Sequence, residues 1–290
     1  MSSKFDLSII ILNYNTSDWL ENVLNSIDTF ASSSIKKEVI VVDNASSDDS
    51  VEMVRKKFRW VDLIVSKENG GFAKGNNLGI KIAQGRYVML LNSDAEFTGK
   101  TDLKSIIEYL DENNAVGMLT PRLELPDGSL DLASHRGEPT PWAAITYFGK
   151  AEQFFPDSKM FGKYHQTWKN FDETHEIDAC SGAAMIVRAS VIQQVGGLDE
   201  QFFMYAEDLD WCRRVREAGF KIVYFPQATV LHHKYKSGLK NTSKKTSSTA
   251  NHHFFETMKQ YYQKHYGNNS PIKKQLIHTG VEVLKKLKKK

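Results

Sequence analysis

The sequence of 290 residues contains only two cysteines, Cys180 and Cys212, which lie far apart in the chain. Two cysteines do not make the dense disulfide framework of a small secreted domain. Cys180 also lies in a run of small and apolar residues, which is typical of a protein core. We therefore expect a reducing, cytoplasmic environment.

Long apolar runs and a targeting segment are also missing. No run approaches the roughly 18 apolar residues that a membrane-spanning helix needs. Residues 1–6 lack the basic and then apolar order of a secretory signal peptide. A chain of this length can bury one large core, or one core with a smaller appended piece. The sequence therefore predicts a globular protein without a spanning helix.

Acidic residues are scarce at the C-terminal end. Residues 231–290 contain fourteen lysines and two glutamates, so their net charge is +12. The whole chain has a net charge of +3, so residues 1–230 carry −9. From Ile272 onward, apolar residues recur among these lysines at helical spacing. A basic amphipathic helix of this kind can lie on an anionic membrane, where each lysine contributes about 1 kcal/mol.

Two other interpretations of this basic tail stay open, namely packing on the body of the protein and contact within a homo-oligomer. The lysines are not interleaved with an aromatic stacking platform. We therefore expect no nucleic-acid partner. From the basic amphipathic helix we expect a location in the cytoplasm, peripheral on the inner face of the cell membrane.

The first half of the chain alternates between strand and helix patterns. Short apolar runs predict strands at 7–12, 38–43, 61–65 and 87–91, and helical spacing separates them. Strands that are apolar on both faces predict an α/β fold with a Rossmann-like, mostly parallel central sheet flanked by helices. Ligands of such sheets bind beyond the carboxyl ends of the strands. Polar residues fall at these ends.

The second half is less regular. Residues 121–176 carry prolines and aromatics without a clear period, whereas strand and helix patterns return after residue 183. We predict one domain over 1–237, with a nucleotide-binding half at 1–120 and an acceptor and catalytic half at 121–237. Residues 238–290 then form a basic helical C-terminal extension.

Three acids, Glu207, Asp208 and Asp210, interrupt an aromatic run at the start of a predicted helix. Acids are stabilised at a helix N-terminus, so capping alone could explain them. However, a second acidic cluster follows the strand at 87–91, and the pair His232-His233 follows a later strand. Carboxylates and an imidazole at element ends predict a metal-assisted site with a general base. Asp210 and Arg213 are spaced for a structural i,i+3 pair.

Several motifs, taken in order, resemble the family 2 glycosyltransferases, which have the GT-A fold. They lie at residues 8–15, 41–48 and 69–79, within a resemblance that covers about 6–237. The Asn-Gly-Gly-Phe-Ala loop at 69–73 is similar to that of the rhamnosyltransferase-like branch. The resemblance implies that the following residues bind a nucleotide-sugar donor, with Asp43 hydrogen-bonding the base: Asn13, Asn15, Asp43, Asn69, Lys74, Asn77, Asn92, Ser93 and Asp94.

The family carries an Asp-x-Asp metal motif where this chain has Asn92-Ser93-Asp94. Because Asn92 supplies no charge, the resemblance assigns Mg²⁺ or Mn²⁺ to Asp94 and His232, with phosphate oxygens completing the ligand set. His233 is the competing candidate for the imidazole ligand.

The same resemblance assigns the general base of an inverting transfer to Asp208, with Glu207 beside it. Ser181 and Gly182 are similar to the segment that floors the acceptor site. The expected activity is an inverting, metal-dependent transfer of a sugar to a glycan or lipid-linked acceptor in cell-surface polysaccharide synthesis. The favoured donor is dTDP-L-rhamnose, followed by UDP-hexoses. The alternatives are a nucleotidyltransferase and a non-catalytic module that binds glycan or nucleic acid.

Overall fold

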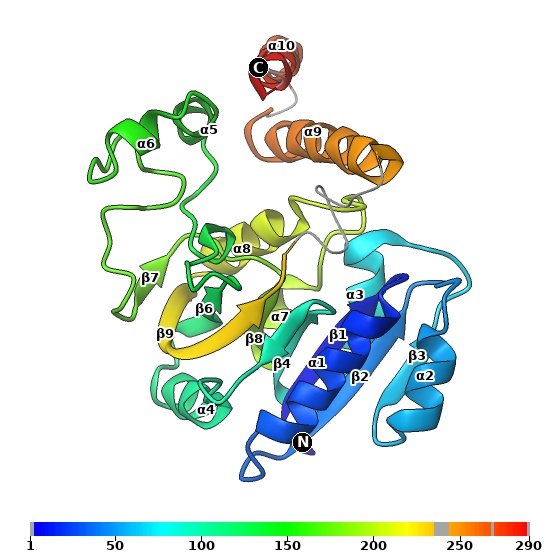
Figure 1. Cartoon of the computed structure of the whole chain (residues 1–290). Coiled ribbons are helices and arrows are strands. Elements are labelled where there is room, and N and C mark those ends of the chain that lie inside the picture. The colour runs from blue at the N-terminus through cyan, green and yellow to red at the C-terminus, as the bar shows by residue number, and fades with distance from the viewer. Residues whose placement is uncertain (1–2, 235–243, 268–269, 289–290) are drawn as a thin grey trace.

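The computed structural model describes residues 3–234, 244–267 and 270–288. Strands and helices alternate in its first half, as predicted (Figure 1). The strands are β1 (Phe5–Asn13), β2 (Lys37–Asp43), β3 (Asp62–Val65), β4 (Gly85–Asn92), β5 (Ala95–Phe97), β6 (Val116–Glu124), β7 (His175–Ile177), β8 (Ala184–Arg188) and β9 (Lys221–His232). The helices are α1 (Ser17–Phe30), α2 (Ser50–Lys57), α3 (Gly71–Ile82), α4 (Leu103–Glu112), the 3₁₀ turn η1 (Leu132–Ser134), α5 (Pro141–Phe148), α6 (Ala151–Phe154), α7 (Ala189–Val195), α8 (Glu207–Glu217), α9 (Lys244–Tyr266) and α10 (Pro271–Lys288).

These strands form a single sheet in the order β3-β2-β1-β4-β8-β6-β9-β5, with β7 paired to β9. The ladders among β1, β2, β3 and β4 are parallel, as the alternating pattern predicted. β8 instead runs antiparallel to both β4 and β6, so the second half of the sheet is mixed. A five-residue apolar strand does not reveal in its sequence the direction in which it enters a sheet.

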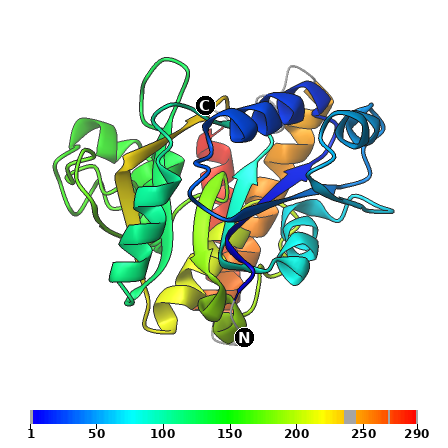
Figure 2. The same cartoon turned by 90° about the horizontal axis from the view of Figure 1, so that it is seen from below.

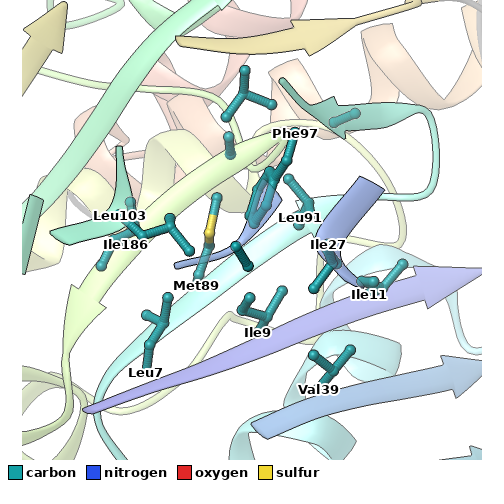
Figure 3. Close-up of a cluster of buried hydrophobic side chains, with 14 of the residues drawn as sticks. Leu7, Ile9, Ile11, Ile27, Val39, Met89, Leu91, Phe97, Leu103 and Ile186 are labelled. Carbon is teal, nitrogen blue, oxygen red and sulfur yellow. The ribbon is translucent and has the colours of Figure 1, made fainter. Parts of the chain in front are cut away.

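Both faces of the sheet are covered by helices, as Figure 2 shows from below. Along β1, Leu7, Ile9 and Ile11 face a core that includes α1, α2 and α4 (Figure 3). Ile10 points the other way, into a core that includes α3, α7 and α8. This alternation explains why the strand is apolar at consecutive positions.

A third apolar cluster joins α5, α9 and α10. It includes Ala144, Tyr261, Tyr262, Val281 and Leu284. One side of α10 therefore packs on the body, which was one of the three interpretations of the basic tail. The predicted boundary at 237–238 lies outside the described residues. Within the described part of the chain, we find no helix with the length and apolar character needed to cross a membrane.

Candidate active site

The parallel register of β1 and β2 brings Asn13 and Asp43 side by side at the strand ends. The Asn13 side-chain amide donates to Asp43 Oδ1 at 2.9 Å, and the backbone N–H of Ser46 donates to Asp43 Oδ2 at 2.9 Å. Both Asn13 and Asp43 are buried. The polar residues noted at the strand ends thus hydrogen-bond to one another, and each oxygen of Asp43 is held by a protein donor.

The loop before α3 is fixed by paired amides. Asn44 Nδ2 donates to Asn69 Oδ1 at 2.8 Å, and Asn44 Oδ1 accepts from the backbone of Gly70 at 3.0 Å. Gly71 has φ +80°, and a Cβ there would lie 2.2 Å from the carbonyl oxygen of Phe203. Only glycine suits this position, for conformational and steric reasons. The loop is therefore tied to the segment that precedes the acidic helix α8.

Three residues predicted to bind the nucleotide-sugar donor are bound to other protein groups in this structure. Asn15 Oδ1 accepts from the backbone of Ser47 at 2.7 Å, and Lys74 forms an exposed pair with Glu68 at 2.8 Å. The Asn77 amide holds the backbone of Leu198 through both its oxygen and its nitrogen. None of these three, nor Asn13 or Asp43, lines the cavity described below. Their role in donor binding stays a prediction.

Asp94 and His232 lie together because β5 pairs with the end of β9, which sets Ala95 opposite His232. Asp94 Oδ1 is buried and has no hydrogen-bond partner among the described residues. His232 Nε2 lies 3.4 Å from this oxygen, outside hydrogen-bonding geometry. The other ring nitrogen, Nδ1, is held by Asp131 Oδ2 at 2.9 Å. A carboxylate behind the imidazole is the usual way to orient a metal-ligating histidine.

The surroundings of His232 stabilise positive charge. Burial alone lowers the pKa of His232, but the carboxylates of Asp131 and Asp94 outweigh it and raise this pKa to about 9. Lys234 Nζ also lies 2.5 Å from Asp131 Oδ1. Burial raises the pKa of Asp131, but His232 and Lys234 together outweigh it and hold this pKa below its ordinary range. A cation between Asp94 and His232 would replace the proton of the ring.

His233 faces away from this pair. Its ring packs against Trp19 with centroids 4.7 Å apart, and Nε2 lies 3.1 Å from Glu96 Oε1. Its backbone N–H donates to the carbonyl of Asp94. The geometry thus favours His232 over His233 as the predicted ligand. No group of three or more metal-ligating side chains occurs in the described residues, so a cation at Asp94 and His232 would need ligands from a bound molecule.

The acidic helix α8 begins with Glu207 and Asp208, as the sequence predicted. Tyr205 and Ala206 precede them with φ of 72° and 68°. Two consecutive left-handed residues without glycine are costly and gather at functional sites. This turn places both acids on the cavity wall.

Asp208 is held by a buried arginine that the sequence analysis missed. Arg136 Nη2 donates to Asp208 Oδ2 at 2.6 Å and to the carbonyl of Cys180 at 2.5 Å. The guanidinium therefore fixes the position of the Asp208 side chain. Glu207 differs, because burial, and then the charge of Asp208, raise its pKa well above the ordinary value. Glu207 Oε2 has no hydrogen-bond partner within the described part of the chain.

The predicted pair of Asp210 with Arg213 is wrong. Asp210 is fully buried and pairs with Arg214 at 2.8 Å, one residue further along the helix. It also binds Lys264 and His265 of α9, at 2.6 and 2.7 Å. Spacing alone allows both i,i+3 and i,i+4 pairs, and the docking of α9 selects the second. Asp210 is structural, as expected, but it connects two helices.

These groups line a cavity of 370 Å³ that lies beyond the ends of β1 and β4. It is lined by nine of the predicted site residues: Asn69, Asn92, Ser93, Asp94, Ser181, Gly182, Glu207, Asp208 and His232. One wall therefore offers hydrogen-bonding groups and a position for a cation, while another offers a carboxylate held by arginine. This combination suits transfer from an anionic leaving group to a nucleophile that must lose a proton.

Another part of the lining is a mostly aromatic wall that we did not predict from the sequence. This aromatic wall comprises Tyr147, Phe148, Tyr164, Phe254, Met258, Tyr261 and Tyr262. Four of these belong to α9, which lies above α8 in Figure 1. The Tyr261 and Tyr262 hydroxyls already donate to Glu138 and to the carbonyl of Thr140, at 2.9 and 3.4 Å. The spacing 254, 258, 261, 262 is a helical stripe, and this signal was available in the sequence.

Comparisons with known proteins agree with this geometry. The model of Glycosyl transferase family 2 matches residues 8–194, and that of Glycosyl transferase family group 2 matches residues 122–284. An N-acetylglucosaminyl-diphospho-decaprenol L-rhamnosyltransferase of Mycobacterium tuberculosis is 28% identical over 80% of this chain and 77% of its own length. The rhamnosyltransferase WbbL of Escherichia coli is 25% identical over 78% of this chain and 82% of its own length.

Among solved structures, the mannosyltransferase PcManGT from Pyrobaculum calidifontis, in complex with GDP-Man and Mn²⁺, is similar with a TM-score of 0.60. The match covers 97% of this chain and 72% of that one at 18% identity, so it supports the fold alone. The predicted GT-A fold is confirmed. The chain belongs to the family 2 glycosyltransferases, enzymes that act on nucleotide sugars, and it is similar to their rhamnosyltransferase members.

Proposed function

We propose that this enzyme transfers a hexose, with L-rhamnose from dTDP-rhamnose favoured over sugars from UDP-hexoses, to a lipid-linked or glycan acceptor with inversion. The observation that carries the proposal is that the Asp94–His232 pair and the Asp208 carboxylate line the same cavity. The first suits the diphosphate of the donor, and the second suits the acceptor hydroxyl.

The residues at the first position fit a divalent cation. Asp94 Oδ1 is buried without a hydrogen-bond partner among the described residues, and His232 Nε2 faces it. A carboxylate, an imidazole and phosphate oxygens together suit Mg²⁺ or Mn²⁺. The similar mannosyltransferase structure contains Mn²⁺. When bound, such a cation would offset the negative charge that grows on the departing nucleoside diphosphate.

Asp208 acts on the acceptor in this proposal. It takes the proton of the acceptor hydroxyl as the oxygen attacks the anomeric carbon, and the bond to the nucleoside diphosphate breaks on the opposite side of the sugar. Arg136 fixes one oxygen of Asp208 and thereby positions the carboxylate. Glu207 holds its proton more strongly than an exposed glutamate, which suits a hydrogen bond donated to the acceptor.

The aromatic wall supports a lipid-linked acceptor. The Tyr261 and Tyr262 side chains are buried with their hydroxyls engaged by the body of the protein, so the ring surface open to a ligand comes from partly exposed neighbours such as Phe148 and Phe254. Apolar rings and the Met258 thioether suit a hydrocarbon chain or the apolar face of a sugar. The name of the Mycobacterium relative describes an acceptor with a decaprenol chain.

A panel of nucleotide sugars with Mn²⁺ tests the donor. We expect dTDP-rhamnose to be consumed fastest, with release of dTDP, and UDP-hexoses to follow. The measurement is nucleoside diphosphate released in the presence of alkyl glycoside acceptors. Release of pyrophosphate from a nucleoside triphosphate would instead favour the nucleotidyltransferase, and binding without turnover of any donor would favour a non-catalytic module.

A tryptophan in place of Met258 tests the aromatic wall. We expect wild-type enzyme to prefer an octyl glycoside to a methyl glycoside, and Met258→Trp to lose about tenfold of this preference, because the larger ring fills space that the chain would occupy. The measurement is kcat/KM for each acceptor. Lys259→Trp adds the same ring one position along α9, outside the cavity lining, and is expected to keep the preference. An equal loss in both variants would contradict the assignment.

A further inference from the structure

Helix α5 is apolar on both of its sides, although one side is open to solvent. Its eight residues, 141–148, include no charged side chain. Ala144, Tyr147 and Phe148 line the cavity on the inner side. Trp142 and Ile145 lie on the outer side and are 45% and 55% exposed. A helix that is apolar all round is normally buried or in contact with lipid, so its exposed side calls for a covering partner.

The exposed apolar side continues into the segment that follows. Phe154, Phe155 and Met160 are 76%, 55% and 54% exposed. The segment is connected to α5 by the indole N–H of Trp142, which donates to the carbonyl of Met160 at 3.0 Å. We call Trp142, Ile145, Phe154, Phe155 and Met160 the α5–α6 patch. Contiguous exposed apolar patches mark interaction sites, whereas scattered apolar side chains do not.

The segment that carries this patch is basic. Lys150, Lys159 and Lys163 are close to the patch residues in sequence, and all three are exposed. Of the nearby acids, Asp157 is exposed, whereas Glu152 is buried and bound to His165 at 2.8 Å. Positive charge therefore dominates the rim of the patch, which complements an anionic surface.

Helix α10 extends the same surface. It packs against α5 and α9, and Figure 1 shows it at the same end of the molecule as α5 and α6. The start of α10 is exposed all round, with Ile272 and Leu276 at 75% and 66% and with Lys273 and Lys274 beside them. Apolar side chains among lysines thus recur on two separate parts of the chain that meet at one end.

We propose that the α5–α6 patch, extended by the exposed start of α10, docks on an anionic lipid bilayer. Tryptophan and phenylalanine are favoured at the membrane interface, and the lysines would contact anionic headgroups. The inner side of α5 lines the cavity, so docking would place the aromatic wall one helix away from the lipid. This last consequence rests on the proposed lipid-linked acceptor, whereas docking itself requires neither donor nor acceptor.

Vesicle sedimentation tests the docking. We expect the full chain to bind vesicles of phosphatidylcholine and phosphatidylglycerol, and to bind vesicles of phosphatidylcholine much more weakly. Phe154→Ser with Phe155→Ser should need about tenfold more lipid for half-binding, and so should Lys150→Glu with Lys159→Glu. Trp60→Ala and Lys36→Glu with Lys67→Glu change exposed side chains elsewhere on the protein, and they should leave binding unchanged.

Fluorescence distinguishes insertion from loose adhesion. Lipids with brominated chains should quench part of the tryptophan emission, and Trp142→Phe should remove this part whereas Trp60→Phe should not. Unchanged binding in the patch variants, with loss only when the terminal lysines are neutralised, would overturn the proposal. So would a dimer, measured by light scattering, that the patch variants abolish. Vesicle binding without nucleotide is independent of transfer to a methyl glycoside, so failure of one leaves the other standing.

Discussion

Asp208→Asn is expected to lower kcat for sugar transfer about 100- to 10,000-fold while the affinity for nucleoside diphosphate stays close to that of the wild type. Asparagine keeps the shape of the side chain and can still accept the hydrogen bond from Arg136, but it cannot take a proton from the acceptor hydroxyl. Asp94 and His232 are unchanged, so the donor subsite keeps its ligands. The measurements are single-turnover transfer and calorimetric titration with dTDP or UDP.

A loss of stability is the main alternative explanation for such a result. Arg136 is buried, and Asp208→Asn leaves the positive charge of its guanidinium without a counterion, which typically costs about 3–5 kcal/mol in a buried pair. The double variant Asp208→Asn with Arg136→Gln removes both charges and is expected to recover much of the free energy of unfolding. If it stays inactive, the carboxylate itself is required. Recovery of transfer in the double variant would contradict the role of Asp208 as base.

Glu207 provides a matched comparison, because it is the neighbouring acid on the same cavity wall. Burial and the charge of Asp208 already favour its protonated form. Glu207→Gln should therefore reduce transfer far less than Asp208→Asn, since the amide keeps the capacity to donate a hydrogen bond. A larger loss at Glu207 than at Asp208 would exchange the two roles.

The sequence was sufficient to predict the fold of the first half, for a physical reason. Strands β1, β2 and β4 are buried on both faces, so each appears as an apolar run that ends in polar residues. The direction of β8 was not predictable in this way, because its apolar run would suit either a parallel or an antiparallel position. The pairs made by Asp210 depended on where α9 docks, and local spacing cannot supply that information.

The residues of the candidate site likewise fall into those that local sequence could predict and those that only tertiary structure brings together. Asp94, Asp208 and His232 belong to short motifs and could be proposed from sequence. Arg136 and Asp131 come from the irregular segment 121–176, where no period marks them, and only tertiary structure brings them to Asp208 and His232. The aromatic positions of α9 did form a helical stripe. This stripe also predicts a buried face, and part of it became a cavity wall because α9 packs against α5 and the residues that precede α8.

Asp94→Asn is expected to remove the dependence of donor binding on divalent cations. In the wild type, Mn²⁺ should tighten the binding of UDP or dTDP, and chelation by EDTA should reverse this effect. Asparagine replaces a buried anionic oxygen with a neutral amide, so the affinity in the presence of Mn²⁺ should fall about 100-fold or more, toward the value measured without metal. Calorimetric titration with and without Mn²⁺ measures the difference directly.

Two neighbouring residues supply controls that separate this assignment from a general effect on the strand ends. Glu96 is the next acid after Asp94, and His233 is the next imidazole after His232, but these two face each other at 3.1 Å away from the cavity. Glu96→Gln and His233→Asn should therefore keep the dependence on Mn²⁺, whereas His232→Asn should lose it together with Asp94→Asn. If His233→Asn abolished the dependence and His232→Asn preserved it, the cation would have to bind on the Trp19 side of β9. The pairing of Asp131 with His232 would then serve only to stabilise the fold.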